Sequence, residues 1–523
     1  MKEKIMVAVV LTMILFGTMH AIVPTMGSPE PIKIGIVGPL GLPHWQPAGM
    51  VPGAEIAAQE INVTGINVGG VYRNISLDFE DEHAVPLNVP EAQAAIQALY
   101  DRGCRIIVGG FRTEVTDPMI EKAMTQAEPV IFLINGAATN ALIAGKVAVN
   151  YNKYKYLFRV NPVNDTILLK TIIGSLSTLI VKMLPIFGCP NMGPYGNITQ
   201  LRYAVVVEQL TWTQTMYTYF SNASIYPGLL GPNVNCTYAA QIPEDATNMA
   251  PYIGGLIASK ARIVIHIFSG RVGVYFSAAW GTAQVKAVPV GINVMAQVQT
   301  HWVNTGGKCE YETILNFVGT RTPVTPQAVA FWDKFVTFTG GAWPIYTAFG
   351  VYNSLYLLKE AIEAAGTTDA DSVVSALEGR DTMSLNGKFR FTGAWNATHN
   401  GNLHDVFCNS SGPTWPSPQY TRALMCQWQA ARMEVVCPRD QVYTKDWAFP
   451  PWMYPNQTDV NYDGKVRVDD VLDAALAFGS DPGHPRWQRR IDINNDYKIR
   501  VDDILGIALD FGKDFSFPLW CDC

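Results

Sequence analysis

Short apolar runs alternate with amphipathic segments along the first part of the chain. The apolar runs are about four to eight residues long, as in buried strands, and the amphipathic segments gather their apolar side chains on one helix face. The pattern predicts strands at 32–37, 75–79, 105–108 and 129–134, and helices at 50–61, 90–102 and 117–127. Strands that alternate with helices of this length indicate a parallel sheet covered on both faces.

A second set of the same kind follows. It predicts strands at 202–207, 261–268 and 286–294, and helices at 212–220, 248–260, 271–283, 326–337, 344–364 and 369–378. Each set is too short to use the whole chain, so we expect an α/β fold of two lobes, each with a parallel sheet flanked by helices. Ligands of open parallel sheets bind beyond the carboxyl ends of the strands, so the loops that leave the strands are the candidate site.

The first of these loops, at 38–47, argues against a nucleotide site. The nearby glycines fall at positions 35, 38 and 41 rather than in a G-x-G-x-x-G pattern, and three prolines remove backbone donors that a phosphate group needs. Trp45 in this loop is better suited to form an apolar wall over a small ligand.

Composition and charge favour an exported protein. The net charge of −6 and the lack of a Lys/Arg cluster argue against nucleic acid as a partner. An apolar run at 5–16 follows two lysines, so we expect residues 1–28 to be a signal peptide, or else an N-terminal anchor. Asn-x-Ser/Thr sequons for glycans exceed the number expected by chance; they begin at Asn62, Asn74, Asn164, Asn197, Asn222, Asn235, Asn396, Asn409 and Asn456.

The chain has nine cysteines and no C-x-x-C pair of the metal-binding type. In an exported protein they are expected to form disulfides, with at least one thiol left over. Cys189–Cys236 and a bridge among Cys408, Cys426 and Cys437 are candidate pairings, and the sequence does not decide between connectivities.

Several sequence blocks carry a family resemblance over about residues 30–400. In chain order they read IKIGIVGPLG, AQAAIQALYDRGCRIIVGGFRTEVTDPM, PVIFLINGAATNAL, YKYLFRVNP, LRYAVVVEQLTWTQ, YTAFGVYNSLYLLKEAIEAAGTTDADSVVSAL and GKFRF. These blocks resemble the type I periplasmic binding proteins, the group of ABC-transporter receptors that includes those for branched-chain amino acids and amides. The resemblance implies a two-lobed fold, with chain crossings near 158, 317 and 395 as the hinge.

The same resemblance implies the domain organisation. A solute-binding domain would span 30–437, with a first lobe at about 32–158 and 318–395 and a second at about 159–317 and 396–437. A linker at 438–456 would lead to the repeat at 457–513 described below, followed by a tail at 514–523.

The resemblance also implies a ligand site between the lobes. The implied contact residues are Trp45, Phe111, Arg112, Thr113, Ala137, Ala138 and Thr139 in the first lobe, and Trp212, Phe268, Ser269 and Asn293 in the second. Backbone amides and the hydroxyls of Thr113 and Thr139 would hold an acceptor oxygen such as a carboxylate, and Arg112 could add a charge-assisted pair. Alternatively Arg112 is solvated, Trp212 belongs to the core and Ser269 is a helix N-cap.

The loop at 291–297 departs from the amino-acid receptors. It reads GINVMAQ and holds no carboxylate to pair with the ammonium group of a ligand. Glu114 and Glu208, near two other candidate loops, could replace it, or Tyr346 and Tyr352 could provide a cation–π surface. A third alternative is a ligand without an ammonium group.

The C-terminal part contains a loop that is repeated after 33 residues. Oxygen-bearing side chains recur at loop positions 1, 3, 5 and 12, and position 7 offers its backbone carbonyl, as calcium loops require. The expected Ca²⁺ ligands are Asp459, Asn461, Asp463, Lys465 and Asp470 in the first loop and Asp492, Asn494, Asp496, Lys498 and Asp503 in the second. An amphipathic helix that ends at glycine is expected after each loop.

This tail resembles a type I dockerin, whose half-loops also end in Asp. The resemblance implies a cohesin-type protein partner, read by the residues 468–469 and 501–502 beside the loops. Two positions depart from the calcium pattern: Tyr497 replaces the usual glycine at position 6 of the second loop, and an arginine occupies position 9 in both loops.

These features predict a non-enzymatic solute-binding receptor of an ABC-type importer, located outside the cell or at its surface. It would capture a small organic solute (an amino acid, an amide or a small organic acid) by lobe closure and present it to a membrane permease. No G-x-S-x-G, H-E-x-x-H or Walker motif indicates an enzyme. His266 is expected to be a core residue, and the triplet at 81–83 a solvated loop. The alternative is a surface-layer or cohesin-binding interaction protein that uses this fold as a scaffold.

Overall fold

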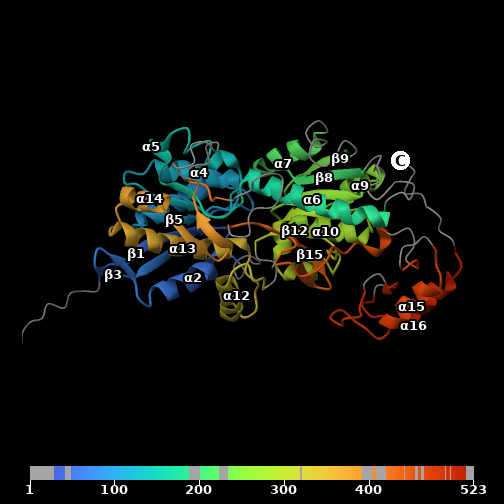
Figure 1. Ribbon diagram of the computed structural model, residues 1–523. Helices are drawn as coiled ribbons and strands as arrows, with labels where there is room; N and C mark the ends of the chain where they lie inside the picture. The colour runs from blue at the N-terminus through green and yellow to red at the C-terminus, as the bar shows by residue number, and fades with distance from the viewer. Residues whose placement is uncertain are drawn as a thin grey trace, which may run out of the picture.

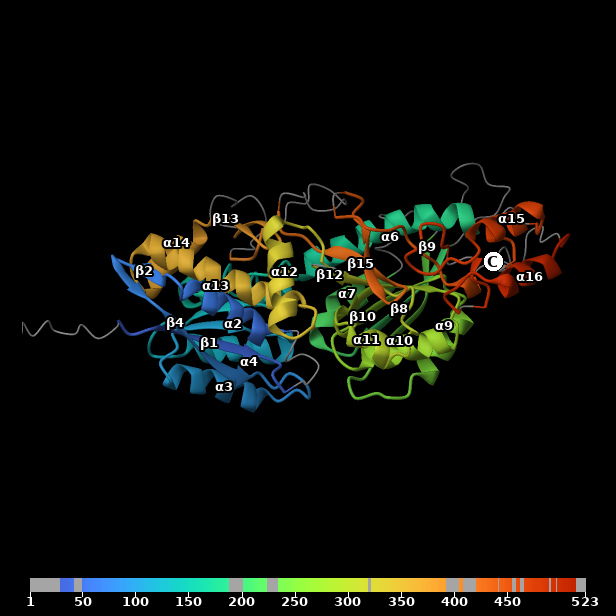
Figure 2. The ribbon, with the colours of Figure 1, turned by 90° about the horizontal axis from the view of Figure 1, so that it is seen from below.

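Two α/β lobes lie side by side, and the small C-terminal unit lies beside the second lobe (Figures 1 and 2). The computed structural model describes residues 29–41, 49–187, 201–222, 234–317, 321–391, 404–407, 420–440, 442–453, 458–460, 465–488, 491–494 and 496–513. The segment 1–28, expected to be a signal peptide or anchor, and the tail at 514–523 lie outside the described residues. Among the helices that are described, none is long and apolar enough to cross a membrane.

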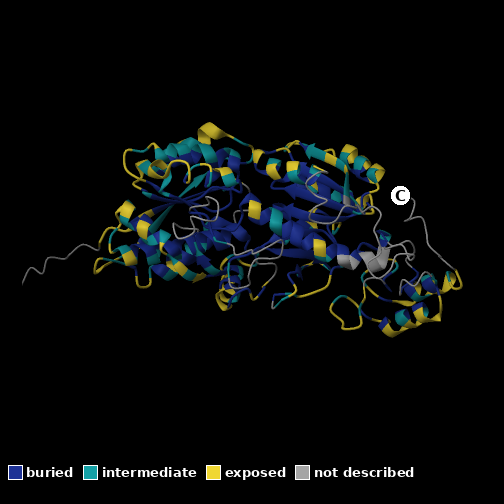
Figure 3. Cartoon of the chain, turned by 45° about the horizontal axis from the view of Figure 1, so that its top comes forward, coloured by how far each residue is buried: buried dark blue, intermediate teal, exposed yellow. Residues whose placement is uncertain are grey.

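The first lobe is built around a five-stranded parallel sheet of order β4-β1-β5-β6-β7. The strands are β1 (Ile32–Gly38), β4 (Ile75–Asp81), β5 (Ile106–Gly109), β6 (Ile131–Ile134) and β7 (Leu157–Arg159). The segments between them contain α2 (Met50–Ile61), a hairpin of β2 (Ile66–Val68) and β3 (Val71–Arg73), α3 (Val89–Asp101), α4 (Thr113–Met124), η1 (Asn140–Leu142) and α5 (Tyr151–Tyr154). The central strands are buried along their length (Figure 3), which explains their continuous apolar sequence.

The second lobe contains a seven-stranded sheet of order β16-β15-β12-β11-β10-β8-β9. The strands are β8 (Leu201–Glu208), β9 (Val234–Ile242), β10 (Ile263–Phe268), β11 (Val288–Asn293), β12 (Thr313–Asn316), β15 (Leu424–Gln429) and β16 (Arg432–Cys437). The helices are α6 (Asp165–Phe187), α7 (Thr211–Ser221), α9 (Ala250–Ser259), α10 (Val272–Thr282), η2 (Val294–Gln297) and α11 (Thr300–Asn304). The first five strands are parallel, whereas β15 and β16 pair antiparallel at one edge.

After β12 the chain returns to the first lobe. The returning elements are α12 (Pro326–Phe338), α13 (Tyr346–Ala365), α14 (Ala370–Glu378) and the hairpin of β13 (Asp381–Ser384) and β14 (Gly387–Arg390). Helix α13 packs closely on α2, and a Cβ atom at Gly53 would stand 2.6 Å from the carbonyl oxygen of Ala348. This close approach places the first residue of α13, Tyr346, at the contact between the lobes.

The C-terminal repeat folds into two equivalent halves. Helices α15 (Val468–Ala477) and α16 (Val501–Leu509) pack together over a small apolar cluster that includes Val466, Ile499 and Ile507. Two equivalent backbone hydrogen bonds join the halves: the amide of Val466 donates to the carbonyl of Lys513 at 3.0 Å, and the amide of Ile499 to that of Ser480 at 2.9 Å. The 33-residue sequence repeat is therefore a repeat in structure. A short turn, η4 (Pro451–Met453), precedes this unit.

The α/β fold with two sheets flanked by helices is confirmed, but several elements escaped the sequence pattern. These are α6, β9, β12 and the β15–β16 hairpin. Helix α6 touches α7, β11, β12 and β15, so it is apolar on more than one side and shows no clear amphipathic period. The hairpin lies in the segment 396–437, which was expected to belong to the second lobe but for which no strand was predicted, and it makes the second sheet mixed rather than purely parallel.

No disulfide joins two of the described cysteines. Cys104, Cys236, Cys309 and Cys426 carry free thiols, so the expected Cys189–Cys236 pairing is not found, and Cys426 and Cys437 are not bridged although they lie on adjacent strands. Cys189, Cys408 and the last two cysteines lie outside the described residues. One sequon, at Asn164, is also unsuited to a glycan, since this side chain is 3% exposed and donates to Asp405 at 3.0 Å.

Candidate functional site

Loops from the carboxyl ends of both sheets meet where the two lobes touch. From the first lobe come the loop after β5, with Phe111 and Arg112, and the loop after β6, with Ala138. From the second come α7 after β8, with Trp212, and the loop after β10, with Ser269. This is the edge at which open parallel sheets bind ligands.

A cavity of about 40 Å³ lies among these loops, and its wall is mainly apolar. The side chains and backbone that line it belong to Phe111, Arg112, Gly136, Ala138, Val163, Leu168, Trp212, Ser269, Ile292, Val294, Gln297, Leu315, Phe317 and Tyr346. We refer to the apolar and aromatic members of this set as the apolar wall. An apolar cavity of about 150 Å³ holds benzene, so the present volume suits no more than one or two water-sized groups.

Arg112 connects the lobes beside this cavity. Its Nη2 donates to Glu208 at 2.9 Å, its Nη1 to Glu244 at 2.6 Å, and its Nε to the hydroxyl of Ser269 at 3.1 Å. All three partners belong to the second lobe, whereas Arg112 and the carbonyl of Ala84, which also accepts from Nη1, belong to the first. We call Arg112, Glu208, Glu244 and Ser269 the interlobe latch.

The carboxylate of Glu208 is held from both lobes. Besides Arg112, it accepts from the amide of Ser269 at 2.6 Å, its hydroxyl at 2.8 Å and the amide of Gly270 at 3.1 Å. Glu208 is fully buried and Arg112 is 1% exposed. Glu114 of the first lobe also accepts from the amides of Thr211 and Trp212 at the start of α7. The carboxylate of Glu208 is therefore occupied by donors of the chain itself, and so is Oε1 of Glu114, whereas Oε2 of Glu114 makes no hydrogen bond with described residues.

The cavity brings together only some of the site residues expected from sequence. Five of them line it: Phe111, Arg112, Ala138, Trp212 and Ser269. Five others do not: Thr113, Ala137, Thr139, Phe268 and Asn293. Trp45 lies outside the described residues.

The residues outside the lining are buried close by. Phe268 packs on Phe276 at a ring distance of 5.1 Å, on the other face of the sheet. Asn293 donates to Glu312 at 2.8 Å inside the second lobe. The carbonyl of Thr139 accepts from Arg159 at 2.5 Å, while the hydroxyls of Thr113 and Thr139 make no hydrogen bond with described residues. These hydroxyls remain available to a solute only after a local rearrangement.

Sequence reasoning missed other parts of the site. Gln297, Val163 and Phe317 line the cavity but were not named as contact residues, although Gln297 ends the candidate loop 291–297 and Phe317 lies at an expected chain crossing. The triplet at 81–83 was expected to be solvated, but Glu82 is fully buried and accepts from the amide of Phe111 at 2.8 Å. Burial raises the pKa of Glu82 well above its ordinary value.

In both expected calcium loops, the last aspartate accepts hydrogen bonds from two backbone amides at equivalent positions. Asp503 accepts from the amides of Ile493 at 2.7 Å and Arg500 at 2.8 Å, and Asp470 accepts from the equivalent amides of Val460 and Arg467 at 2.7 and 2.8 Å. Asn461 and Asp463 lie outside the described residues; the remaining expected ligands, Asp459, Lys465, Asp492, Asn494, Asp496 and Lys498, lie within them. Asp492 is also buried, and the gathering of buried carboxylates in each loop fits a cation.

Comparisons with known proteins agree with this architecture. The sequence model of a family described as "Periplasmic binding protein" matches residues 231–407. An ABC transporter substrate-binding protein from Sphaerobacter thermophilus has a similar structure, with a TM-score of 0.58 and 15% identity over 79% of this chain and 99% of that one. The fold is that of the two-lobed periplasmic binding proteins.

Two further solved structures were determined with a bound ligand. A branched-chain amino acid transporter substrate-binding protein from Streptococcus pneumoniae, in complex with isoleucine, has a TM-score of 0.57 and 14% identity over 80% of this chain and 100% of that one. An ABC-transporter solute-binding protein from R. palustris, in complex with benzoate, has a TM-score of 0.57. It is 13% identical over 79% of this chain and 99% of that one. These proteins are described as binding proteins and not as enzymes. No curated protein matches the chain.

Proposed function

We propose that this chain is an exported solute-binding receptor that presents a small organic solute to an ABC-type membrane permease. The observation that carries the proposal is the cavity at the carboxyl ends of both sheets, lined by residues of both lobes. A solute that contacts both lobes favours their closed arrangement, because it gains its full set of contacts only there. The match of part of the chain to a periplasmic family supports export.

The site favours a solute with a substantial apolar part. The apolar wall contains four aromatic side chains, and the charged groups beside it already pair with each other in the interlobe latch. An amino acid, an amide or a small organic acid remains the proposed class, with recognition by shape and hydrogen bonds. Because the cavity is smaller than any of these solutes, the lobes or the wall must first move apart to admit one.

Thermal unfolding in the presence of amino acids, amides and small carboxylic acids tests this function. At least one member of the library is expected to raise Tm by a few degrees, since a ligand that binds only the folded state stabilises it. Trp212→Ala should abolish the shift, whereas Trp302→Ala, a half-buried residue outside the cavity, should keep it. If no solute shifts Tm, the alternative of an interaction protein with a solute-binding scaffold is favoured instead.

We further propose that the C-terminal repeat binds Ca²⁺ and docks on a cohesin-type protein. The two loops would supply oxygen ligands from positions 1, 3, 5, 7 and 12, which is the coordination that this hard cation prefers. A second observation supports docking: the exposed apolar residues on the two halves correspond at the 33-residue spacing. The pairs are Val468 and Val501, Leu472 and Leu505, Leu476 and Leu509, and Phe478 and Phe511.

Calorimetric titration with Ca²⁺ tests the first part of this proposal. The whole chain is expected to bind two ions, and Asp470→Ala or Asp503→Ala should each remove one. Asp481→Ala, an exposed acidic residue between the two halves, should leave both. Docking is then tested with an isolated cohesin domain, whose binding should require Ca²⁺ and should be lost when Leu472 and Leu505 are both replaced by Asp. Binding that persists without Ca²⁺ would contradict the proposal.

A further inference from the structure

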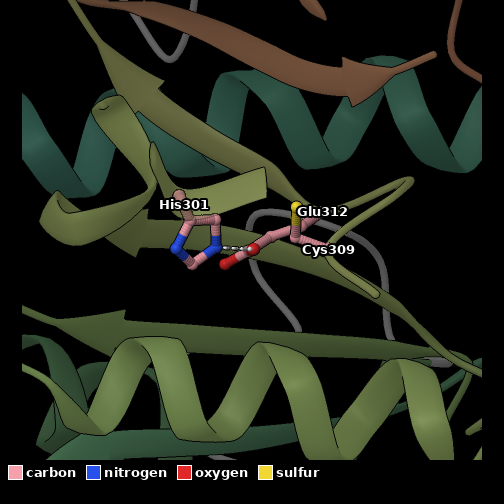
Figure 4. A group of neighbouring side chains, drawn as sticks. All are labelled: His301, Cys309 and Glu312. Carbon is pink, nitrogen blue, oxygen red and sulfur yellow. Dashed lines mark hydrogen bonds and ion pairs between the residues drawn. The ribbon is translucent and has the colours of Figure 1, made fainter. Parts of the chain in front are cut away.

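A second group of buried polar side chains lies inside the second lobe, separate from the interlobe cavity. His301 lies in α11, Cys309 lies in the loop that follows, and Glu312 directly precedes β12. His266 lies in the middle of β10. Figure 4 shows His301, Cys309 and Glu312 pointing toward one another. All four side chains are between 0% and 1% exposed, so the group is sealed from solvent.

Three of the four donor atoms are close enough to share one ion, and the fourth, on His266, adjoins Glu312. The ligating atoms of His301, Cys309 and Glu312 all lie within 4.8 Å of one another. His301 Nε2 stands 3.0 Å from Glu312 Oε2, and His266 Nε2 stands 3.3 Å from Glu312 Oε1. Two ligands bound to one Zn²⁺ at about 2.0–2.3 Å lie roughly 3.3–3.7 Å apart in a tetrahedron, so small shifts suffice to form one.

The hydrogen bonding of the group is incomplete without a cation. Nδ1 of His266 has no hydrogen-bond partner among the described residues, although the ring is fully buried, and its Nε2 has only the 3.3 Å contact with Glu312. Such an unpaired buried nitrogen costs about 1–3 kcal/mol. Glu312 is held in place by Asn293, which donates to its Oε1 at 2.8 Å. That contact has the orienting role that outer partners play for metal-binding carboxylates.

The charge of the group also points to a cation. Among the described residues, Glu312 forms ion pairs with the two histidines and with no lysine or arginine. A buried carboxylate needs a positive partner, which is either a protonated imidazole or a metal ion. Zn²⁺ with one carboxylate, one thiolate and two neutral imidazoles makes a site of zero net charge, which suits this apolar surrounding.

We propose that His266, His301, Cys309 and Glu312 form a zinc site inside the second lobe. The ion would tie β10 to α11 and to the start of β12. It would thereby stiffen the second-lobe wall of the interlobe cavity, because Asn293 directly precedes η2, whose residues Val294 and Gln297 line that cavity. The site goes beyond solute binding and does not depend on it.

Cobalt titration of the whole chain tests the site, because Co²⁺ bound to a thiolate gives a charge-transfer band in the near ultraviolet that calcium loops cannot produce. After treatment with a chelator, the wild-type protein is expected to show this band, saturating at one Co²⁺ per chain. Cys309→Ser should abolish it. Cys104→Ser, which changes another buried free cysteine in the first lobe, should keep it.

Zinc should also raise Tm of the wild type by about 3 °C at a hundredfold excess over Kd, and much less in Cys309→Ser and His301→Ala. Far-ultraviolet circular dichroism establishes that the variants are folded, and His266→Ala tests the fourth donor in the same way. A wild-type protein without the band and without a zinc-dependent Tm shift overturns the proposal, and so does a band that survives Cys309→Ser. In either case the group is a buried polar cluster that holds no metal ion.

Discussion

Around the interlobe cavity, the charged side chains pair with each other across the two lobes, whereas the rest of the lining is mainly apolar. The interlobe latch joins the lobes through Arg112, which pairs with Glu208 and Glu244 across the contact. The apolar wall surrounds the cavity itself and includes Phe111, Trp212 and Tyr346. Under the proposed function, charge would serve the contact between the lobes, and the shape of the apolar wall would select the solute.

This separation differs from the site that the sequence suggested. Arg112 was expected to pair with a carboxylate of the solute, and in the structure it pairs with carboxylates of the second lobe. A solute that meets the apolar wall need not bring a charge to complete the site. Variants of the two regions should therefore affect different properties.

The largest effect on stability is expected from a change in the interlobe latch. Arg112→Ala leaves the buried carboxylate of Glu208 without its charged partner, which should reduce the free energy of unfolding by about 3–5 kcal/mol. Denaturant unfolding measures this change. Arg321→Ala, which removes an exposed ion pair with Asp333, is the matched control and should change little. Equal effects of the two substitutions would show that the latch contributes no more than a surface pair.

A smaller effect, on solute affinity, is expected from the apolar wall. Trp212→Ala removes an aromatic side chain that is 5% exposed at the cavity, and should weaken solute binding by about 2 kcal/mol, or roughly 30-fold in Kd. Trp212→Phe keeps an aromatic wall and loses only the bond from Nε1 to Ser269, so it should weaken binding much less. Calorimetric titration with the solute from the library measures both. An Ala variant that binds as tightly as the wild type places the solute elsewhere.

The smallest effect on the free energy of unfolding is expected from the partly exposed polar network around Glu121, which does not join the lobes. Desolvation raises the pKa of Glu121, but hydrogen bonds from Lys146, Lys153 and Tyr154 outweigh it and lower the pKa to about 2. The pKa in the folded state is thus below the ordinary value of 4.5, so the stabilisation is present above pH 4.5 and is lost as the pH falls toward 2.

Glu121→Gln should flatten the pH dependence of the unfolding free energy in this window, by less than the change caused by Arg112→Ala because the side chain is 37% exposed. Chemical unfolding at a series of pH values measures it. An unchanged pH profile would mean that the network is screened by solvent and does not stabilise the fold.

Residues in continuous or repeated patterns could be predicted from the sequence, and residues placed by tertiary contacts could not. The strands around Ile107 and Ile265 are mainly apolar runs, and the calcium-loop residues recur at a fixed spacing. Both patterns can be recognised from the sequence alone. Phe111, Trp212 and Ser269 were expected as contact residues from the resemblance to the periplasmic binding proteins, and all three line the cavity.

The contacts between the two lobes could not be predicted from the sequence. Arg112 and Glu208 are 96 residues apart, and each alone looks like a loop residue with solvent around it. Gln297 and Phe317 line the cavity from η2 and from the crossing after β12, and neither was named as a contact residue. His266 was expected to be a core residue and is fully buried, but its contact with Glu312, 46 positions away, could not be read from the sequence.

The most direct test of the central claim is a side-by-side titration of the wild type and Trp212→Ala with the solute found in the library. The account predicts one saturable site per chain in the wild type and a Kd about 30-fold weaker in the variant. Equal affinities in the two proteins, or no binding of any solute to the wild type, would contradict it.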